Sequence, residues 1–233
     1  MRREELTERS PIRVLDRSIH GGLGRGNLGV VIARPGIGKT AFLVGVALDV
    51  LMRGGKVLHV SLDQTMDKVR DYYDDIFMEL AHSQSLEDVW RARAEIERDR
   101  RIVCFFEDTF SVDKLSQAVS FWKEHGDFVP AAIVIEGFEF AGVEESELAK
   151  LREIACGCDA ELWMSAVTTR AAERNERGIP EPLAHLESGL DVVLSMAHDG
   201  QSVHVALHKD HDSTQVSELK LALDPRTMLI VKE

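Results

Sequence analysis

Short apolar segments of strand length alternate with longer segments of helical periodicity through the first two thirds of this 233-residue chain. Strand followed by helix, repeated several times, predicts a parallel sheet covered by helices on both faces. The nearly continuous apolar character of the strands fits burial from both sides. The expected strands are 28–32, 57–61, 102–106, 131–135 and 162–166, and the expected helices are 39–52, 65–81, 86–99, 112–123 and 145–154.

Further apolar segments follow one another near the carboxyl end with only short turns between them. Asp199-Gly200 and Asp224-Pro225 are turn signals, and no helical pattern separates these segments. The predicted fold class is therefore α/β, with a central, mostly parallel twisted sheet flanked by helices and a C-terminal antiparallel extension. The strands expected in that extension are 192–196, 203–207, 218–223 and 228–231.

Length and composition fit one large domain. An apolar content of 44% supports a sizeable packed core. We expect residues 1–10 to form a flexible N-terminal tail and residues 11–233 to form a single domain. The chain carries 28 Lys and Arg against 40 Asp and Glu, a formal charge of −12. Because an acidic chain repels phosphate backbones at long range, nucleic-acid binding would require a local basic patch.

Neither a membrane span nor a secretion signal is expected. No apolar run approaches 18 residues, and the first eleven residues carry charges where a signal peptide needs an apolar core. Three cysteines, Cys104, Cys156 and Cys158, are too few for a disulfide framework, which points to a reducing interior. We therefore expect a cytoplasmic protein with no membrane partner.

A glycine-rich segment follows the first expected strand and opens the first expected helix. Small residues let backbone N–H groups turn inward around an anion, a lysine neutralises terminal phosphates, and a hydroxyl binds magnesium. Gly36, Gly38, Lys39 and Thr40 supply these parts at the required spacing. The helix adds its positive amino-terminal end. The predicted nucleotide-binding residues are Ala33, Arg34, Pro35, Gly36, Ile37, Gly38, Lys39, Thr40 and Ala41.

Residues 21–42, GGLGRGNLGVVIARPGIGKTAF, resemble the entry to the RecA-like P-loop ATPases, and ARPGIGKTAF resembles the bacterial replicative helicases of the DnaB type. The KaiC-like group shares the entry segment 16–26. The resemblance covers the chain from about Pro11 to its end, in order. It continues at Ser61-Leu-Asp63, Glu107-Asp108-Thr109, the strand that ends at Glu136, Ser165 and Lys209-Asp-His211.

The resemblance implies a site for ATP and Mg²⁺, with Lys39 and Asp63 as catalytic residues. Asp63 would position the attacking water, while Thr40 and Glu136 would hold the magnesium ion. Two of these residues differ in length from the family pattern. Asp63 is one methylene shorter than the usual glutamate, and Glu136 is one methylene longer than the usual aspartate. No short pattern distinguishes ATP from GTP.

Other departures concern activation by a neighbouring subunit. In the family a glutamine couples the γ-phosphate to the substrate loop, and an arginine of the next protomer stabilises the transition state; Ala166 and His211 stand there instead. Lys209 and His211 are the candidates for a finger acting in trans, with the arginines of loop 168–182 as weaker ones. Arginine fingers supply about a thousandfold or more in rate. Hydrolysis is therefore expected to be slow.

The predicted function is a Mg-ATP-binding RecA-like protein, a slow or partner-regulated ATPase that couples nucleotide state to oligomer assembly or conformational change. The expected partners are ATP and further copies of the chain, in a ring, for example a hexamer, or a filament, together with a protein client. One alternative is a nucleotide-sensing interaction module that does not hydrolyse ATP. A second alternative is a DNA helicase or recombination accessory ATPase.

The residues give the nucleic-acid alternative little support. In RecA-like rings the loops after the Glu136 and Ser165 strands line the central channel. The first of these loops carries four glutamates and no basic residue, whereas phosphate contacts need Lys or Arg. In the second loop three arginines stand against three acidic residues. The glutamates are Glu139, Glu144, Glu145 and Glu147, and the arginines are Arg170, Arg174 and Arg177.

Two clusters invite a zinc hypothesis that we do not favour. Cys156 and Cys158 form a single close pair with no second pair to complete a site. His204, His208 and His211 fall within eight residues, but spacing fixes no acidic or cysteine ligand beside them. Buried free cysteines and interfacial histidines are the plainer interpretation.

Overall fold

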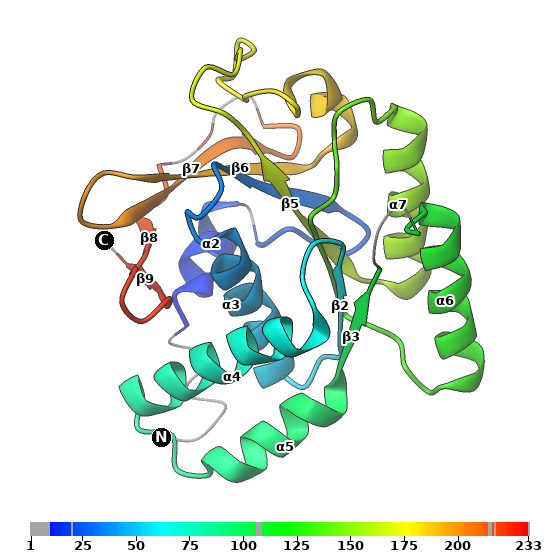
Figure 1. The fold of residues 1–233 in the computed structure, drawn as a ribbon, viewed down its shortest axis with the longest axis vertical. Coiled ribbons are helices and arrows are strands. Elements are labelled where there is room, and N and C mark those ends of the chain that lie inside the picture. Colours follow the sequence, from blue (N-terminus) through cyan, green and yellow to red (C-terminus); the bar gives the residue numbers. More distant parts are fainter. Residues whose placement is uncertain (1–9, 20, 106–108, 214–215, 217, 233) are drawn as a thin grey trace.

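The computed structural model describes residues 10–19, 21–105, 109–213, 216 and 218–232. Within these residues one mixed sheet runs in the order β3-β2-β4-β5-β1-β6-β7-β8-β9 (Figure 1). The strands are β1 (Leu28–Ala33), β2 (Val57–Ser61), β3 (Arg100–Cys104), β4 (Ala132–Glu136), β5 (Glu161–Val167), β6 (Val192–His198), β7 (Val203–Asp210), β8 (Leu221–Leu223) and β9 (Ile230–Lys232).

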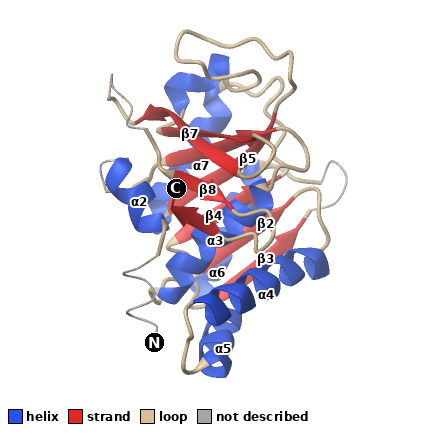
Figure 2. Ribbon diagram, turned by 90° about the vertical axis from the view of Figure 1, so that its left-hand side faces the viewer, coloured by secondary structure: helices blue, strands red, loops and turns tan. Residues whose placement is uncertain are grey.

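Helices cover both faces of the sheet, as the buried strands require. One face packs against α2 to α5 and the other against α6, α7 and the 3-10 helix η1 (Figures 1 and 2). The helices are α2 (Ile12–Ser18), α3 (Lys39–Met52), α4 (Met66–Ser83), α5 (Val89–Asp99), α6 (Val112–His125), α7 (Glu145–Cys158) and η1 (Ala184–Gly189). Among the described helices, none is long and apolar enough to cross a membrane.

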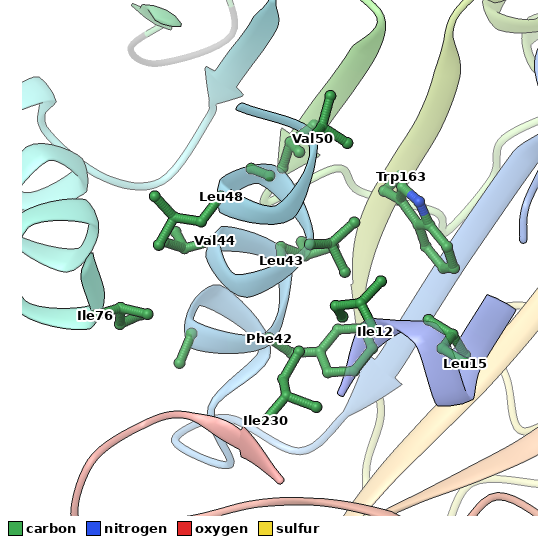
Figure 3. Close-up of a cluster of buried hydrophobic side chains, with 14 of the residues drawn as sticks. Ile12, Leu15, Phe42, Leu43, Val44, Leu48, Val50, Ile76, Trp163 and Ile230 are labelled. Atoms are coloured by element: carbon green, nitrogen blue, oxygen red, sulfur yellow. The ribbon is translucent and has the colours of Figure 1, made fainter. Parts of the chain in front are cut away.

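Helix α3 lies at the centre of the larger core. Most of its residues are buried, including every residue from Leu48 to Met52. Val44 and Leu48 point toward Ile76 of α4, and Phe42 lies beside Ile230 of β9 (Figure 3). Because α3 begins in the glycine-rich segment, this packing fixes that segment relative to the sheet.

The predicted fold class is confirmed. Strands β3, β2, β4, β5, β1 and β6 run parallel, and β7 to β9 form the antiparallel extension. One detail differs, because β6 pairs in parallel with β1 as well as antiparallel with β7. It therefore joins the two parts of the sheet and does not belong to the extension alone.

Several boundaries differ from the predicted ones. Strand β3 begins at Arg100, two residues before the expected start, because the Arg100 side chain is buried by its ion pair with Glu97 and its stacking on Tyr73. Helix α5 begins after Asp88, whose carboxylate accepts a hydrogen bond from the Arg91 amide. Helices α2 and η1 were not predicted. The family segment at Glu107-Asp108 and most of the tail at 1–10 lie outside the described residues.

Candidate nucleotide-binding site

The glycine-rich segment joins β1 to α3. Ala33 ends β1 in strand conformation, where a Cβ is tolerated, so alanine can replace the first glycine of the general pattern. Gly38 is the N-cap of α3, with a φ of 110° that favours glycine. A Cβ on Gly38 would lie 2.5 Å from Leu223 Cδ2. The C-terminal extension therefore packs against the loop, and only glycine fits between them.

A cavity of about 620 Å³ opens at the carboxyl end of the parallel strands, where ligands bind in open α/β sheets. It brings together most of the predicted site residues from β1, β2, β4 and β5. Its lining includes Pro35, Gly36, Ile37, Gly38, Lys39, Thr40, Ala41, Asp63, Glu136 and Ser165. Ala33 and Arg34 are at the base of the loop and outside the cavity lining.

Lys39 is half-buried at this cavity. Its ammonium lies 3.3 Å from the carbonyl oxygen of Ala33 and 3.4 Å from that of Arg34. Burial lowers the pKa of Lys39, while the carboxylates of Glu136 and Asp63 oppose that change. A bound phosphate would give this cation a stronger partner than two neutral carbonyls.

Asp63 follows β2, and its carboxylate lies against the turn after β4. Partial burial raises the pKa of Asp63, and the nearby Glu136 adds to the rise. A Cβ on Gly137 would lie 2.8 Å from Asp63 Cγ, and the φ of Gly137 is 75°. The Gly137 amide donates to Ser165 Oγ at 3.1 Å. Gly137 was not predicted from the sequence, because its role depends on the pairing of β4 with β2.

Glu136 ends β4 and is only 2% exposed. Its Oε2 atom lies 3.1 Å from Nε2 of His59, and Nδ1 of His59 lies 3.1 Å from the Tyr73 hydroxyl. Neither His59 nor Tyr73 was predicted as a site residue. The available signal was a histidine in the middle of an otherwise apolar strand, VLHVS.

The donor set suits magnesium. The Thr40 hydroxyl and the carboxylates of Glu136 and Asp63 line one cavity, and Mg²⁺ prefers such oxygen ligands together with phosphates. Thr40 and Glu136 are the residues that would hold the ion. Bound there, magnesium would neutralise charge on the phosphates.

One comparison with known proteins supports the fold. A solved structure of an ATPase domain matches with a TM-score of 0.67 at 18% sequence identity, covering 94% of this chain and 88% of that chain. The chain has the RecA-like P-loop fold. No protein-family model matches it, and no curated protein matches it. At this identity the likeness establishes the fold alone, so the activity is argued below from the site.

The two candidate fingers, Lys209 and His211, are not among the residues that line the cavity. The Lys209 ammonium donates to the carbonyls of Glu187 and Leu190 at 2.7 and 2.5 Å. His211 contacts the Asp210 carboxylate and the Leu23 carbonyl at 2.8 and 2.9 Å. Burial lowers the pKa of His211, but these two contacts outweigh it and raise the pKa above the ordinary value. Either side chain would have to leave its partners to reach a neighbour's phosphate.

The candidate zinc ligands do not converge. His204 lies 2.6 Å from the Asp199 carboxylate, and His208 Nε2 lies 2.7 Å from Ser195 Oγ. Cys156 is exposed, whereas Cys158 is buried. Among the described residues no group of three or more His, Cys, Asp or Glu side chains is placed to hold a metal ion.

Proposed function

We propose that this chain binds Mg-ATP and hydrolyses it slowly or under the control of a partner. The convergence of the phosphate loop, Asp63 and Glu136 on one cavity carries the proposal. Three separate segments of the chain supply the cation, the carboxylate for water and the carboxylate for magnesium. Chance assembly of this set at the carboxyl ends of parallel strands is improbable, whereas a nucleotide site requires it.

The residues have distinct roles in this proposal. Lys39 and the amino-terminal end of α3 neutralise the phosphates. Asp63 orients the attacking water and accepts its proton, for which a raised pKa is suited. Glu136 and Thr40 hold the magnesium ion. Turnover would then change the charge in the cavity and drive a change in assembly or conformation.

Four residues support slow turnover. Asp63 is shorter than the family's glutamate, and a misplacement of about 1 Å can cost roughly a hundredfold in rate. Ala166 is buried at the end of β5 and offers no side-chain hydrogen bond to a phosphate. Lys209 and His211 are held by groups of their own chain. An assembly of several copies, or a protein client, would have to release a finger before hydrolysis could accelerate.

The direct test measures phosphate release from Mg-ATP. We expect Lys39→Ala to abolish both tight nucleotide binding and phosphate release, because the phosphates lose their main cation. Lys150→Ala is the matched control, since Lys150 is an exposed lysine on α7 paired with Asp113. Phosphate release that is identical in Lys39→Ala and the unaltered protein would refute the enzyme proposal.

The internal contacts of Lys209 and the buried Ala166 favour one alternative, a nucleotide sensor that does not turn over. In that case bound ATP would stabilise an assembly of copies without hydrolysis. Sedimentation of the protein with and without Mg-ATP separates the two functions. A nucleotide-dependent change in particle size without phosphate release would favour the sensor, and size that changes only during turnover would favour the enzyme.

A further inference from the structure

A buried polar network extends behind Glu136. His59 is completely buried in β2, and Tyr73 of α4 is 1% exposed. In the parallel register Ser61 is opposite Glu136 and His59 is opposite Val134. Because side chains two residues apart lie on the same face of a strand, His59 sits one step behind Glu136 on the face that α3 and α4 cover. The family resemblance gives no role to either His59 or Tyr73.

When Glu136 is ionised, the direction of its hydrogen bond with His59 is fixed. A carboxylate can only accept, so Nε2–H of His59 donates to Glu136 Oε2. In the tautomer that carries a single proton on Nε2, Nδ1 accepts from the Tyr73 hydroxyl. Each nitrogen of the buried ring has one partner, and the ring is fixed at both ends.

The tyrosine is itself held in place. The Arg100 guanidinium lies 4.3 Å from the centroid of the Tyr73 ring, and Arg100 pairs with Glu97 at 2.6 Å. These contacts connect α4 to β3 and to the end of α5. Because Tyr73 is held in place, its hydrogen bond keeps the imidazole ring of His59 in one orientation. The Glu136 carboxylate must therefore adopt the orientation that accepts a hydrogen bond from this imidazole.

From this geometry we propose that His59 is a positioning residue that orients the Glu136 carboxylate for magnesium, an inference that rests on the proposed function. The hydrogen bond to Oε2 fixes the rotation of a carboxylate that has one more methylene, and so one more rotatable bond, than the family's aspartate. Groups that hydrogen-bond to a metal ligand commonly fix the orientation of that ligand, and His59 would do this for Glu136. His59 thereby compensates for the longer side chain.

The test compares His59→Asn with His59→Gln. The amide nitrogen of Gln falls near the position of Nε2 and can still donate to Glu136, whereas that of Asn falls near Nδ1 and cannot. The measurement is binding of a fluorescent ATP analogue, first in EDTA and then across a Mg²⁺ titration. We expect the Mg²⁺ concentration for half-maximal enhancement of binding to rise about tenfold or more in His59→Asn. His59→Gln should stay within about threefold of the unaltered protein.

Binding of the analogue in EDTA should be the same in both variants, because neither touches the phosphate loop. Equal Mg²⁺ midpoints in the two variants, shifted or unshifted, would overturn the proposal, since a merely structural histidine would not distinguish Gln from Asn. Tyr73→Phe, which keeps the bond between His59 and Glu136, should shift the midpoint less than His59→Asn. Failure of the proposed function itself would look different: the unaltered protein would not bind the analogue, with or without Mg²⁺.

Discussion

At the scale of single residues, the position of Asp63 depends on residue 137 being a glycine, which has no side chain. Gly137 follows Glu136 and leaves the space in which the Asp63 carboxylate lies, with 2.8 Å between Asp63 Cγ and the place of a Cβ on Gly137. The same residue donates its amide to Ser165. Gly137 therefore contacts groups that follow β2 and lie on β5, and it connects the Glu136 end of β4 to the Asp63 carboxylate after β2.

We expect Gly137→Ala to slow hydrolysis by about a hundredfold, because the new methyl group displaces Asp63 by an amount of the order of 1 Å. Nucleotide binding should fall much less, since the phosphate loop is untouched. Gly54→Ala is the matched control: Gly54 has a similar φ of 84°, but nothing lies within 4 Å of its added Cβ. Equal effects of the two substitutions on phosphate release would mean that backbone strain, and not the position of Asp63, is responsible.

At the scale of elements, the sequence predicted those features that depend on neighbouring residues. Helix α3 was predicted with its observed bounds, because the glycine-rich segment and the apolar periodicity act locally. The predicted start of β3 was wrong, because a charged residue, Arg100, is buried by contacts with α4 and α5 that no local pattern encodes.

The site divides in the same way. The spacing singled out the glycine-rich segment and the resemblance pointed to Asp63 and Glu136, and the structure brings all of them to one cavity, while their roles stay predictions. The partners behind them could not be predicted, because His59 meets Glu136 through the register of β2 on β4, and Tyr73 reaches His59 from a helix. Pairings of this kind depend on tertiary structure.

An element-scale prediction concerns the end of α3 remote from the glycine-rich segment. Asp49 has a side chain that is 2% exposed and pairs with Arg13 of α2 and with Arg53, the latter at 3.0 Å. We expect Asp49→Asn to lower the free energy of unfolding by about 1–3 kcal/mol, because it removes the charge from buried hydrogen bonds. Urea denaturation measures this change.

The matched control is Asp67→Asn, which removes an exposed charge at 3.9 Å from Arg70 on α4. Such a surface pair contributes little to the free energy of unfolding, so the urea midpoint of Asp67→Asn should be almost the same as that of the unaltered protein. Equal shifts in the two variants would show that the link between α2 and α3 is not important for stability.

At the scale of the whole molecule, acidic groups gather at particular places. Four exposed glutamates occupy the region after β4, and Arg174 and Arg177 of the loop after β5 already bind the Gly178 carbonyl and the Glu187 carboxylate. Another acidic side chain, Glu161, lies half-buried at the opposite end of the sheet. Burial raises the pKa of Glu161 to about 7, which Arg53 opposes and the carboxylates of Asp16 and Asp49 reinforce.

The raised pKa of Glu161 predicts a pH dependence of stability. The folded protein binds the Glu161 proton more tightly than the unfolded chain, whose ordinary pKa is 4.5. The stabilisation from Glu161 is therefore complete below about pH 4.5 and is lost as the pH rises through about 7. Glu161→Gln should unfold like the unaltered protein at about pH 4 but be more stable at about pH 8, by ~1–3 kcal/mol.

Urea denaturation at a series of pH values measures the difference between the two proteins. Glu153→Gln, on the exposed side of α7, makes the same change in net charge and serves as the control. A difference between Glu161→Gln and the unaltered protein that does not grow with pH would contradict a carboxyl held protonated by the fold.

The last prediction follows from the net charge of −12 and its distribution. Single-stranded DNA should leave ATP turnover unchanged within about twofold at low salt, where phosphate contacts are strongest. The exposed glutamates Glu139, Glu144, Glu145 and Glu147 repel a phosphate backbone at the surface where a helicase of this fold would grip it. Phosphate release measured with and without the DNA, at about 50 and 200 mM salt, tests this. Stimulation that falls steeply with salt would instead support the helicase or recombination accessory function, because only released counterions produce that slope.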